Sequence, residues 1–116
     1  MNDAKKVLFV CSQNRLRSPT AEQIYGASVG VETRSAGLDR NAVVPLTLEL
    51  LDWADIIFVM ERSHKNKLRK KFGKTVAAKL IVSLDIPDEF DFMAPDLVQL
   101  LKMKLCRYLG ESGKRA

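Results

Sequence analysis

The chain has little cysteine, glycine and proline, and it has no long apolar run. Two cysteines among 116 residues cannot build a disulfide framework or a four-thiolate zinc site. Six glycines and four prolines are far too few for a collagen-like chain. The longest apolar runs, residues 7–11 and 56–60, are too short to cross a bilayer, and the N-terminal residues show no signal-peptide pattern. We therefore expect a cytoplasmic protein with free thiols and no membrane partner.

Apolar residues make up 47% of the chain, which is enough for one packed core. The length is that of one domain, so we interpret residues 1–116 as a single domain with a polar tail from about residue 111. The net charge of +5 is compatible with nucleic acid or another anionic partner. Much of the excess positive charge comes from seven basic residues: Arg62, Lys65, Lys67, Arg69, Lys70, Lys71 and Lys74.

Strand-like and helix-like segments alternate four times. Strands are predicted at four β-branched and aromatic runs, residues 7–10, 31–35, 56–60 and 80–84. Helices are predicted over residues 19–29, 45–51 and 64–72, and from 95 or 96 onward. Ser63 is the predicted N-cap of the third helix, and Gly73 is predicted to end it. This alternation predicts an α/β three-layer sandwich with a four-stranded parallel sheet, order 2-1-3-4, and helices on both faces. Ligands bind such sheets at the carboxyl ends of the strands.

The loop after the first strand, residues 11–18, is polar and contains Cys11. It leads into Ser18 and Pro19, which are typical of the N-cap and first position of a helix. The backbone N–H groups of such a loop converge on one point, and the helix dipole adds partial positive charge there. Both features favour the thiolate form of a cysteine. We therefore predict an anion-binding cradle with a nucleophile, Cys11, at its base.

Other side chains of this loop suit the same chemistry. The planar guanidinium of Arg17 matches two oxygens of a tetrahedral phosphate. Ser18 is placed to donate a hydrogen bond to the thiolate. Asn14 tolerates the left-handed backbone that a tight cradle needs, and its amide can hold the loop. The remaining residues of the predicted phosphate-binding loop are Ser12, Gln13, Arg15 and Leu16.

The segment CSQNRLRSP after KKVLFV resembles the Cys-X5-Arg loop of the low-molecular-weight protein tyrosine phosphatases. Three later segments strengthen the resemblance: SAG at 35–37, ADIIFVM at 54–60, and DIPDEF at 85–90, which is similar to the family's late Asp-Pro-aromatic loop. The resemblance implies a hydrolase of phosphate monoesters, acting on a phosphotyrosine protein or an aryl phosphate. It implies no metal or other cofactor, because the arginine and the loop amides supply the positive charge.

The resemblance also implies catalytic roles. Cys11 attacks phosphorus and becomes a phosphocysteine, while Arg17 and the loop N–H groups stabilise the transition state. Asp88 protonates the leaving oxygen and later activates water. Asp85 is the alternative acid, because Glu89 rather than proline follows Asp88.

Several further positions bear on the site. The resemblance places Ser35 as a support of the loop, whereas Phe90 and Phe92 flank the acidic loop and are candidates to wall an aromatic substrate. Gln13 stands where the family usually has glycine, so the backbone there must tolerate a side chain. Arg15 stands where the family usually has a small or aliphatic residue, and its charge would favour a more anionic substrate.

A second cysteine, the histidine and the basic segment are interpreted as structural or surface features. Cys106 falls among leucines of the last helix and is expected in the core. His64 is expected on the surface, without a role in binding or catalysis. The basic segment at 62–74 is interpreted as a solvated helix face, because it has little aromatic interleaving for base stacking. Nucleic acid is therefore not the expected partner, and we expect a monomer.

Other functions remain open beside the phosphatase. An arsenate reductase of the same fold would need a further thiol, and only Cys106 is available. A phosphocysteine carrier would need neither Arg17 nor an acid. A phosphate- or phosphoprotein-binding module with weak or no catalysis would keep Cys11 and Arg17 and tolerate the loss of Asp88. A nucleic-acid-binding protein would use the basic segment.

Overall fold

The computed structural model describes residues 4–26, 28 and 30–110. The predicted polar tail from residue 111 lies outside these residues. Strands and helices alternate along the chain in the order β1 (Lys5–Cys11), α1 (Arg17–Tyr25), β2 (Val31–Gly37), α2 (Leu48–Trp53), β3 (Ile56–Val59), α3 (Arg62–Val76), β4 (Leu80–Ser83) and α4 (Pro95–Leu109). No helix of the described part is long and apolar enough to cross a membrane.

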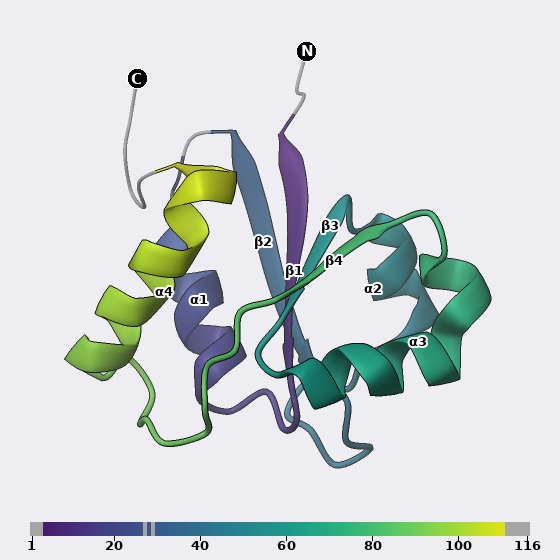
Figure 1. Ribbon diagram of the computed structural model, residues 1–116, viewed down its shortest axis with the longest axis horizontal. Helices are drawn as coiled ribbons and strands as arrows, with labels where there is room; N and C mark the ends of the chain where they lie inside the picture. The colour runs from purple at the N-terminus through teal and green to yellow at the C-terminus, as the bar shows by residue number, and fades with distance from the viewer. Residues whose placement is uncertain (1–3, 27, 29, 111–116) are drawn as a thin grey trace.

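The strands form one parallel sheet in the order β2-β1-β3-β4. Helices α1 and α4 cover one face of the sheet, and α2 and α3 cover the other (Figure 1). Successive side chains of the central strand β1 point to opposite faces of the sheet. Val7 and Phe9 pack with α1 and α4, whereas Leu8 and Val10 pack with α2 and α3. The predicted three-layer sandwich and its strand order are thus confirmed.

The start of α1 differs from the prediction. The helix begins at Arg17 after Leu16, with no side-chain cap, and ends at Tyr25. Its first turn is closed by Thr20, whose N–H and hydroxyl both donate to the Leu16 carbonyl, at 3.1 and 2.6 Å. Ser18 therefore lies inside the first turn, and its hydroxyl is engaged with other groups of the loop.

The helices on the other face also begin and end at residues other than those predicted from the sequence. Helix α2 starts at Leu48, because the Thr47 hydroxyl accepts from the Leu50 N–H at 3.2 Å, and Pro45 instead forms a bridge with Gly37. Helix α3 is capped by Glu61 rather than Ser63. It continues past Gly73 to Val76, with a non-helical residue at Phe72 where it kinks.

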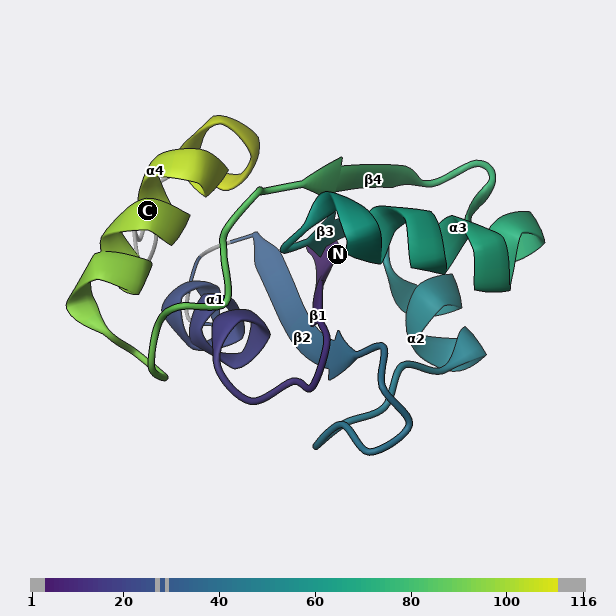
Figure 2. The ribbon, with the colours of Figure 1, turned by 60° about the horizontal axis from the view of Figure 1, so that its bottom comes forward.

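The parallel strands all end at one edge of the sheet, which Figure 2 turns toward the viewer. The loop after β1, the first residues of α3 after β3 and the loop after β4 meet at this edge. Side chains far apart in the sequence are thereby brought around Cys11, the last residue of β1.

Candidate active site

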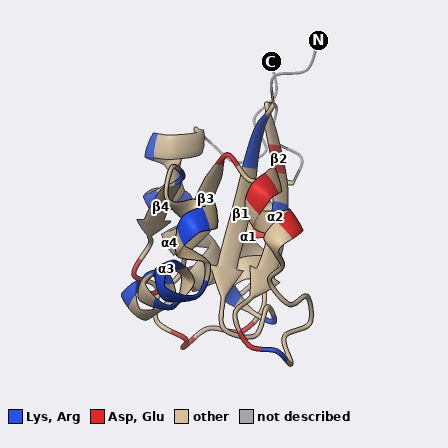
Figure 3. Cartoon of the chain, turned by 90° about the vertical axis from the view of Figure 1, so that its right-hand side faces the viewer, with Lys and Arg blue, Asp and Glu red and all other residues tan. Residues whose placement is uncertain are grey.

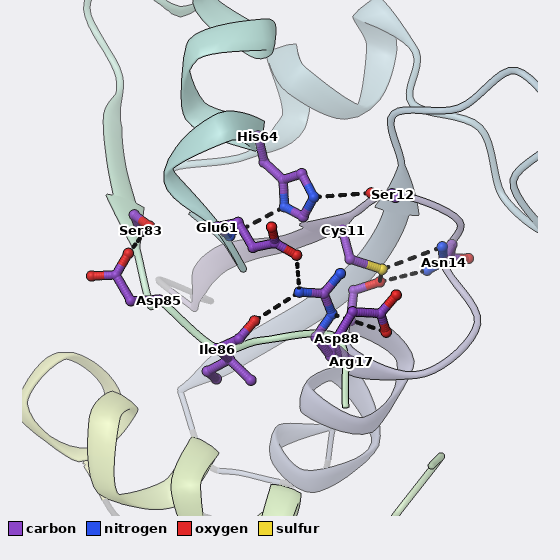
Figure 4. Close-up of polar contacts among 11 residues, drawn as sticks. Cys11, Ser12, Asn14, Arg17, Glu61, His64, Ser83, Asp85, Ile86 and Asp88 are labelled. Atoms are coloured by element: carbon purple, nitrogen blue, oxygen red, sulfur yellow. Dashed lines mark hydrogen bonds and ion pairs between the residues drawn. The ribbon is translucent and has the colours of Figure 1, made fainter. Parts of the chain in front are cut away.

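Cys11 lies buried at the base of a tight loop that leads into α1. Its sulfur is 2.9 Å from Ser18 Oγ and accepts a hydrogen bond from the Asn14 N–H at 3.3 Å (Figure 4). Two polar groups of the cradle therefore lie within hydrogen-bond distance of the sulfur.

Asn14 fixes the shape of the cradle. Its φ of 56° confirms the predicted left-handed backbone. Its buried side-chain amide donates to Ser18 Oγ and to Ser35 Oγ, each at 2.9 Å. Ser35 in turn donates to Glu22 Oε1 at 2.5 Å. This chain of hydrogen bonds runs from the thiol through the loop and Ser35 to α1.

The segment after β2 holds the outer side of the cradle. Three of its amides donate to successive carbonyls of the loop: Leu38 to Cys11, Asp39 to Ser12 and Val43 to Gln13, at 2.9–3.0 Å. A Cβ on Gly37 would lie 2.6 Å from the Ser12 oxygen and 2.9 Å from the Asn14 nitrogen, so only glycine fits there. Gln13 has an exposed side chain and no positive φ, and the loop accommodates it without glycine.

Arg17 is buried beside Cys11 and is anchored along one edge. Its Nη1 donates to Glu61 Oε2 at 2.5 Å and to the Ile86 carbonyl at 2.7 Å. Its Nε lies 3.8 Å from Asp88 Oδ1. The other terminal nitrogen makes none of these contacts and lies on the side of Cys11 (Figure 4). The edge formed by Nε and Nη2 can therefore receive two phosphate oxygens while Nη1 stays in place.

The anchor Glu61 was not among the predicted site residues. The hydrogen bond from Arg17 holds the pKa of Glu61 below its usual value of 4.5. Glu61 also caps α3 through a capping box with His64. The sequence does contain a pattern compatible with this capping box, a glutamate three residues before a histidine and directly after a buried strand. The prediction placed the cap at Ser63 instead.

The prediction that His64 lies on the surface was wrong. His64 is 2% exposed, and its Nε2 lies 3.0 Å from Ser12 Oγ in the cradle. Its Nδ1 accepts from the Glu61 N–H at 3.2 Å, which assigns the proton of the neutral ring to Nε2. His64 therefore donates to Ser12 and ties the start of α3 to the loop that contains Cys11.

Acidification should destabilise this contact. Burial lowers the pKa of His64 below its usual value of 6.5; Arg17 and Lys67 lower it further, and Glu61 and Asp39 partly oppose them. The unfolded chain thus binds a proton more readily than the folded one, so stability is full above pH 6.5 and falls as the pH drops through the folded pKa. Since His64 is the chain's one histidine, thermal denaturation between pH 7.5 and roughly 5.5 should show this loss.

The control for that prediction is His64→Gln, which keeps an amide donor near Ser12 and does not titrate. We expect its melting temperature to vary less between pH 7.5 and roughly 5.5 than that of the wild type. Equal pH dependence in the two proteins would rule out His64 as its source. The lowered pKa of Glu61 adds a further loss of stability only below pH 4.5.

An open pocket of about 420 Å³ lies at the mouth of the cradle. It is lined by Cys11, Ser12, Gln13, Arg15, Leu16, Arg17, Asp39, Lys67 and Asp88. Asp88 is thus brought to the cradle, whereas Asp85 is not: its carboxylate accepts from Ser83 Oγ at 2.8 Å, outside this pocket (Figure 4). Of the two candidate acids, only Asp88 lies beside Arg17.

Two other predicted positions differ in the structure. Phe90 is half-buried against the core and is not among the residues that line the pocket, whereas the exposed Phe92 lines a separate groove beside the cradle. Cys106 is exposed, not in the core. The buried stripe of α4 is Leu97, Leu101 and Leu105, and the next residue lies about 100° further around the helix.

Comparisons with known proteins agree with this architecture. No family model matches the chain. A protein-arginine-phosphatase of Bacillus subtilis (strain 168) is 27% identical over 95 residues, a match that covers 59% of this chain and 63% of that protein. The match therefore spans less than two thirds of that relative's length.

Solved structures match over nearly the whole chain. A low-molecular-weight protein tyrosine phosphatase from T. tengcongensis has a TM-score of 0.73 at 24% identity, covering 91% of this chain and 100% of that one. The YwlE arginine phosphatase from Geobacillus stearothermophilus has a TM-score of 0.72 at 24% identity, over 90% and 92%. The tyrosine phosphatase Wzb from Escherichia coli K30, in complex with phosphate, has a TM-score of 0.71 at 19% identity, over 94% and 97%. The chain has the fold of the low-molecular-weight protein tyrosine phosphatases.

Proposed function

We propose that this protein hydrolyses phosphate monoesters through a phosphocysteine intermediate, with phosphotyrosine in proteins or a small aryl phosphate as substrate. One observation carries the proposal. The buried Cys11 and the Arg17 guanidinium line one pocket, and a carboxylate, Asp88, lines the same pocket 3.8 Å from Arg17 Nε. A nucleophile, an oxyanion-binding group and an acid thus surround one site.

In the first step the Cys11 thiolate attacks phosphorus, and the bond from phosphorus to the ester oxygen breaks. Arg17 and the N–H groups of the loop bind the three equatorial oxygens, where negative charge accumulates. Asp88 gives its proton to the departing oxygen, so the leaving group departs as a neutral alcohol or phenol. The phosphoryl group is then held on sulfur.

In the second step a water molecule attacks the phosphocysteine. Asp88, now a carboxylate, takes a proton from the water, and the bond from sulfur to phosphorus breaks. Inorganic phosphate leaves, Cys11 returns as thiolate and Asp88 returns as acid. Ser18 stabilises the returning thiolate, because its hydroxyl lies 2.9 Å from the sulfur.

A second candidate function is hydrolysis of phosphoarginine in proteins, which the names of two of the relatives support. The charge of the pocket favours the phosphate ester instead. Three cationic side chains line it, Arg15, Arg17 and Lys67, against two carboxylates, Asp39 and Asp88. The guanidinium of a phosphoarginine would therefore enter a site of net positive charge, whereas an uncharged phenol ring meets no such repulsion.

The remaining alternatives have less support. An arsenate reductase needs a second thiol, and the other cysteine, Cys106, lies in the last turn of α4, at the end of the molecule away from Cys11 (Figure 1). A carrier or a binding module does not account for Asp88 at the pocket mouth beside Arg17.

The test is hydrolysis by the wild-type protein in the presence of a metal chelator. A small aryl phosphate, a phosphotyrosine peptide and a phosphoarginine peptide of the same sequence would be compared. We expect turnover of the first two, with kcat/KM for the phosphotyrosine peptide at least about tenfold above that for phosphoarginine. Hydrolysis of phosphoarginine alone would establish the second candidate, and no hydrolysis of any substrate would overturn both.

A further inference from the structure

Helix α3 has a row of exposed lysines that the proposed chemistry does not use. Lys67, Lys70, Lys71 and Lys74 are all exposed. The spacing of three and four residues places the first three on one side of the helix, and Lys74 follows in the next turn, after the kink at Phe72. We call these four residues the lysine row. Figure 3 shows how Lys and Arg positions follow one another along α3.

The lysine row begins at the candidate active site. Lys67 lines the same pocket as Cys11 and Asp88. From Lys67 to Lys71, before the kink at Phe72, the helix rises by about 6 Å, at about 1.5 Å per residue. An extended peptide covers that length in roughly two residues. A chain whose phosphorylated residue sits in the cradle can therefore place its neighbouring side chains along the row.

Three charges of the row, on Lys70, Lys71 and Lys74, form no ion pair within 4 Å among the described residues, whereas Lys67 interacts electrostatically with Glu61. Among the described residues, the two ion pairs within 4 Å both involve Arg17. Lys70 and Lys74 make no such pair, and Lys71 contacts only the Phe72 ring, 5.6 Å from its ammonium group. An uncompensated row of like charges attracts an anionic chain and raises its rate of association.

A peptide suits this surface better than a nucleic acid. Single-stranded nucleic acid is held by aromatic side chains on which its bases stack. The one aromatic residue of α3 is Phe72, which is half-buried against the core under α2 and α3. The continuity of the row with the phosphate pocket instead suits an acidic chain that also carries the phosphoryl group.

We propose that the lysine row docks an acidic segment of the substrate protein, so that the preferred substrate is a phosphotyrosine with Asp or Glu within about three residues on one side. This inference rests on the proposed phosphatase function. The row adds affinity outside the cradle, and the chemical step at Cys11 is unchanged by it.

The experiment compares three phosphotyrosine peptides: one with three acidic residues before the phosphotyrosine, one with three after it, and one with glutamine at all six positions. We expect kcat/KM at low ionic strength to be roughly tenfold higher for one acidic peptide than for the glutamine peptide, since each exposed ion pair contributes about 1.4- to 5-fold. The preference should shrink as salt is raised, because 0.15 M salt screens charges beyond about 8 Å.

The variant is Lys70→Gln/Lys74→Gln, which removes two charges of the row outside the pocket. We expect it to reduce the preference for the acidic peptide to about threefold or less. The matched control, Arg62→Gln/Arg69→Gln, removes two charges from the same helix at residues that line a different groove with Ser83 and Asp85. It should keep the wild-type preference.

A small aryl phosphate, too short to reach Lys70, Lys71 and Lys74, separates the two proposals. Hydrolysis of it together with equal kcat/KM for all three peptides would overturn the docking surface and leave the proposed function standing. Failure to hydrolyse it would overturn the proposed function itself. Salt-dependent binding of a single-stranded oligonucleotide that needs Lys70 and Lys74, without any peptide preference, would assign the row to nucleic acid and overturn the proposal.

Discussion

Replacing Cys11 by serine should abolish hydrolysis of phosphate esters and leave the fold intact. The Asn14 N–H donates to the sulfur and the Ser18 hydroxyl lies 2.9 Å from it. A serine hydroxyl in place of the thiol stays protonated at neutral pH and is a much weaker nucleophile than a thiolate. Loss of an activated nucleophile lowers kcat by about 10⁴-fold or more. The measurement is turnover of an aryl phosphate, with thermal denaturation to show that the sheet is unaffected.

The matched control is Cys106→Ser, at the exposed thiol of α4. It should retain wild-type turnover, because Cys106 lies at the far end of the molecule from the cradle. Acid quenching during turnover should also trap one phosphoryl group on Cys11 of the wild-type chain, detectable as a thiol phosphate by mass spectrometry. Turnover that persists in Cys11→Ser would exclude the phosphocysteine mechanism.

The cradle could be predicted from the sequence because its parts are contiguous. Cys11, Asn14 and Arg17 lie within one loop between a buried strand and a helix, so strand periodicity and loop chemistry sufficed to bring them together. The four β-branched runs likewise predicted the sheet, since parallel strands buried on both faces must be apolar throughout. For the cradle and for each strand, the residues that allow the prediction are neighbours in the sequence.

The anchoring of Arg17 could not be predicted in that way. Glu61 lies 44 positions from Arg17, and His64 lies 52 positions from Ser12. Only the order of β1 and β3 in the sheet brings these side chains together. These contacts could not be predicted without the exact start of α3. With Ser63 as the cap, His64 would be the first residue of the helix, whereas in the structure it is the third residue after the cap Glu61.

Ser18 shows why element boundaries were less predictable than the elements. A serine before a proline is typical of an N-cap, but its hydroxyl is shared between Cys11 and Asn14. The cradle therefore takes the group that a cap would use, and α1 starts at Arg17 without a side-chain cap. The hydrogen bonds of Ser18 within the candidate site therefore also determine how α1 begins.

Asp88→Asn should slow hydrolysis by an amount that depends on the leaving group. For an ester with a poorly stabilised leaving oxygen, loss of the proton donor should lower kcat/KM by roughly 10²–10⁴. For a nitrophenyl phosphate, whose leaving group departs without a proton, the loss should be much smaller. The measurement is kcat/KM across a series of aryl phosphates of increasing phenol pKa, for the wild type and the variant.

Asp85→Asn is the control, because Asp85 is three residues away on the same acidic loop and contacts Ser83 rather than Arg17. It should leave the dependence on the leaving group unchanged. The large loss appearing in Asp85→Asn instead would transfer the role of acid to Asp85 and contradict the geometry of the pocket.

The leaving-group series also separates proton donation from an effect of charge. Asp88 Oδ1 lies 3.8 Å from Arg17 Nε, so Asp88→Asn also removes a negative charge beside the guanidinium that binds phosphate. A change in that charge alone would alter phosphate binding equally for every ester and shift all the rates by one factor. Proton donation matters most where the leaving oxygen is most basic, so only loss of the acid makes the slope against phenol pKa steeper. A steeper slope in Asp88→Asn, with an unaltered slope in Asp85→Asn, would therefore identify Asp88 as the general acid.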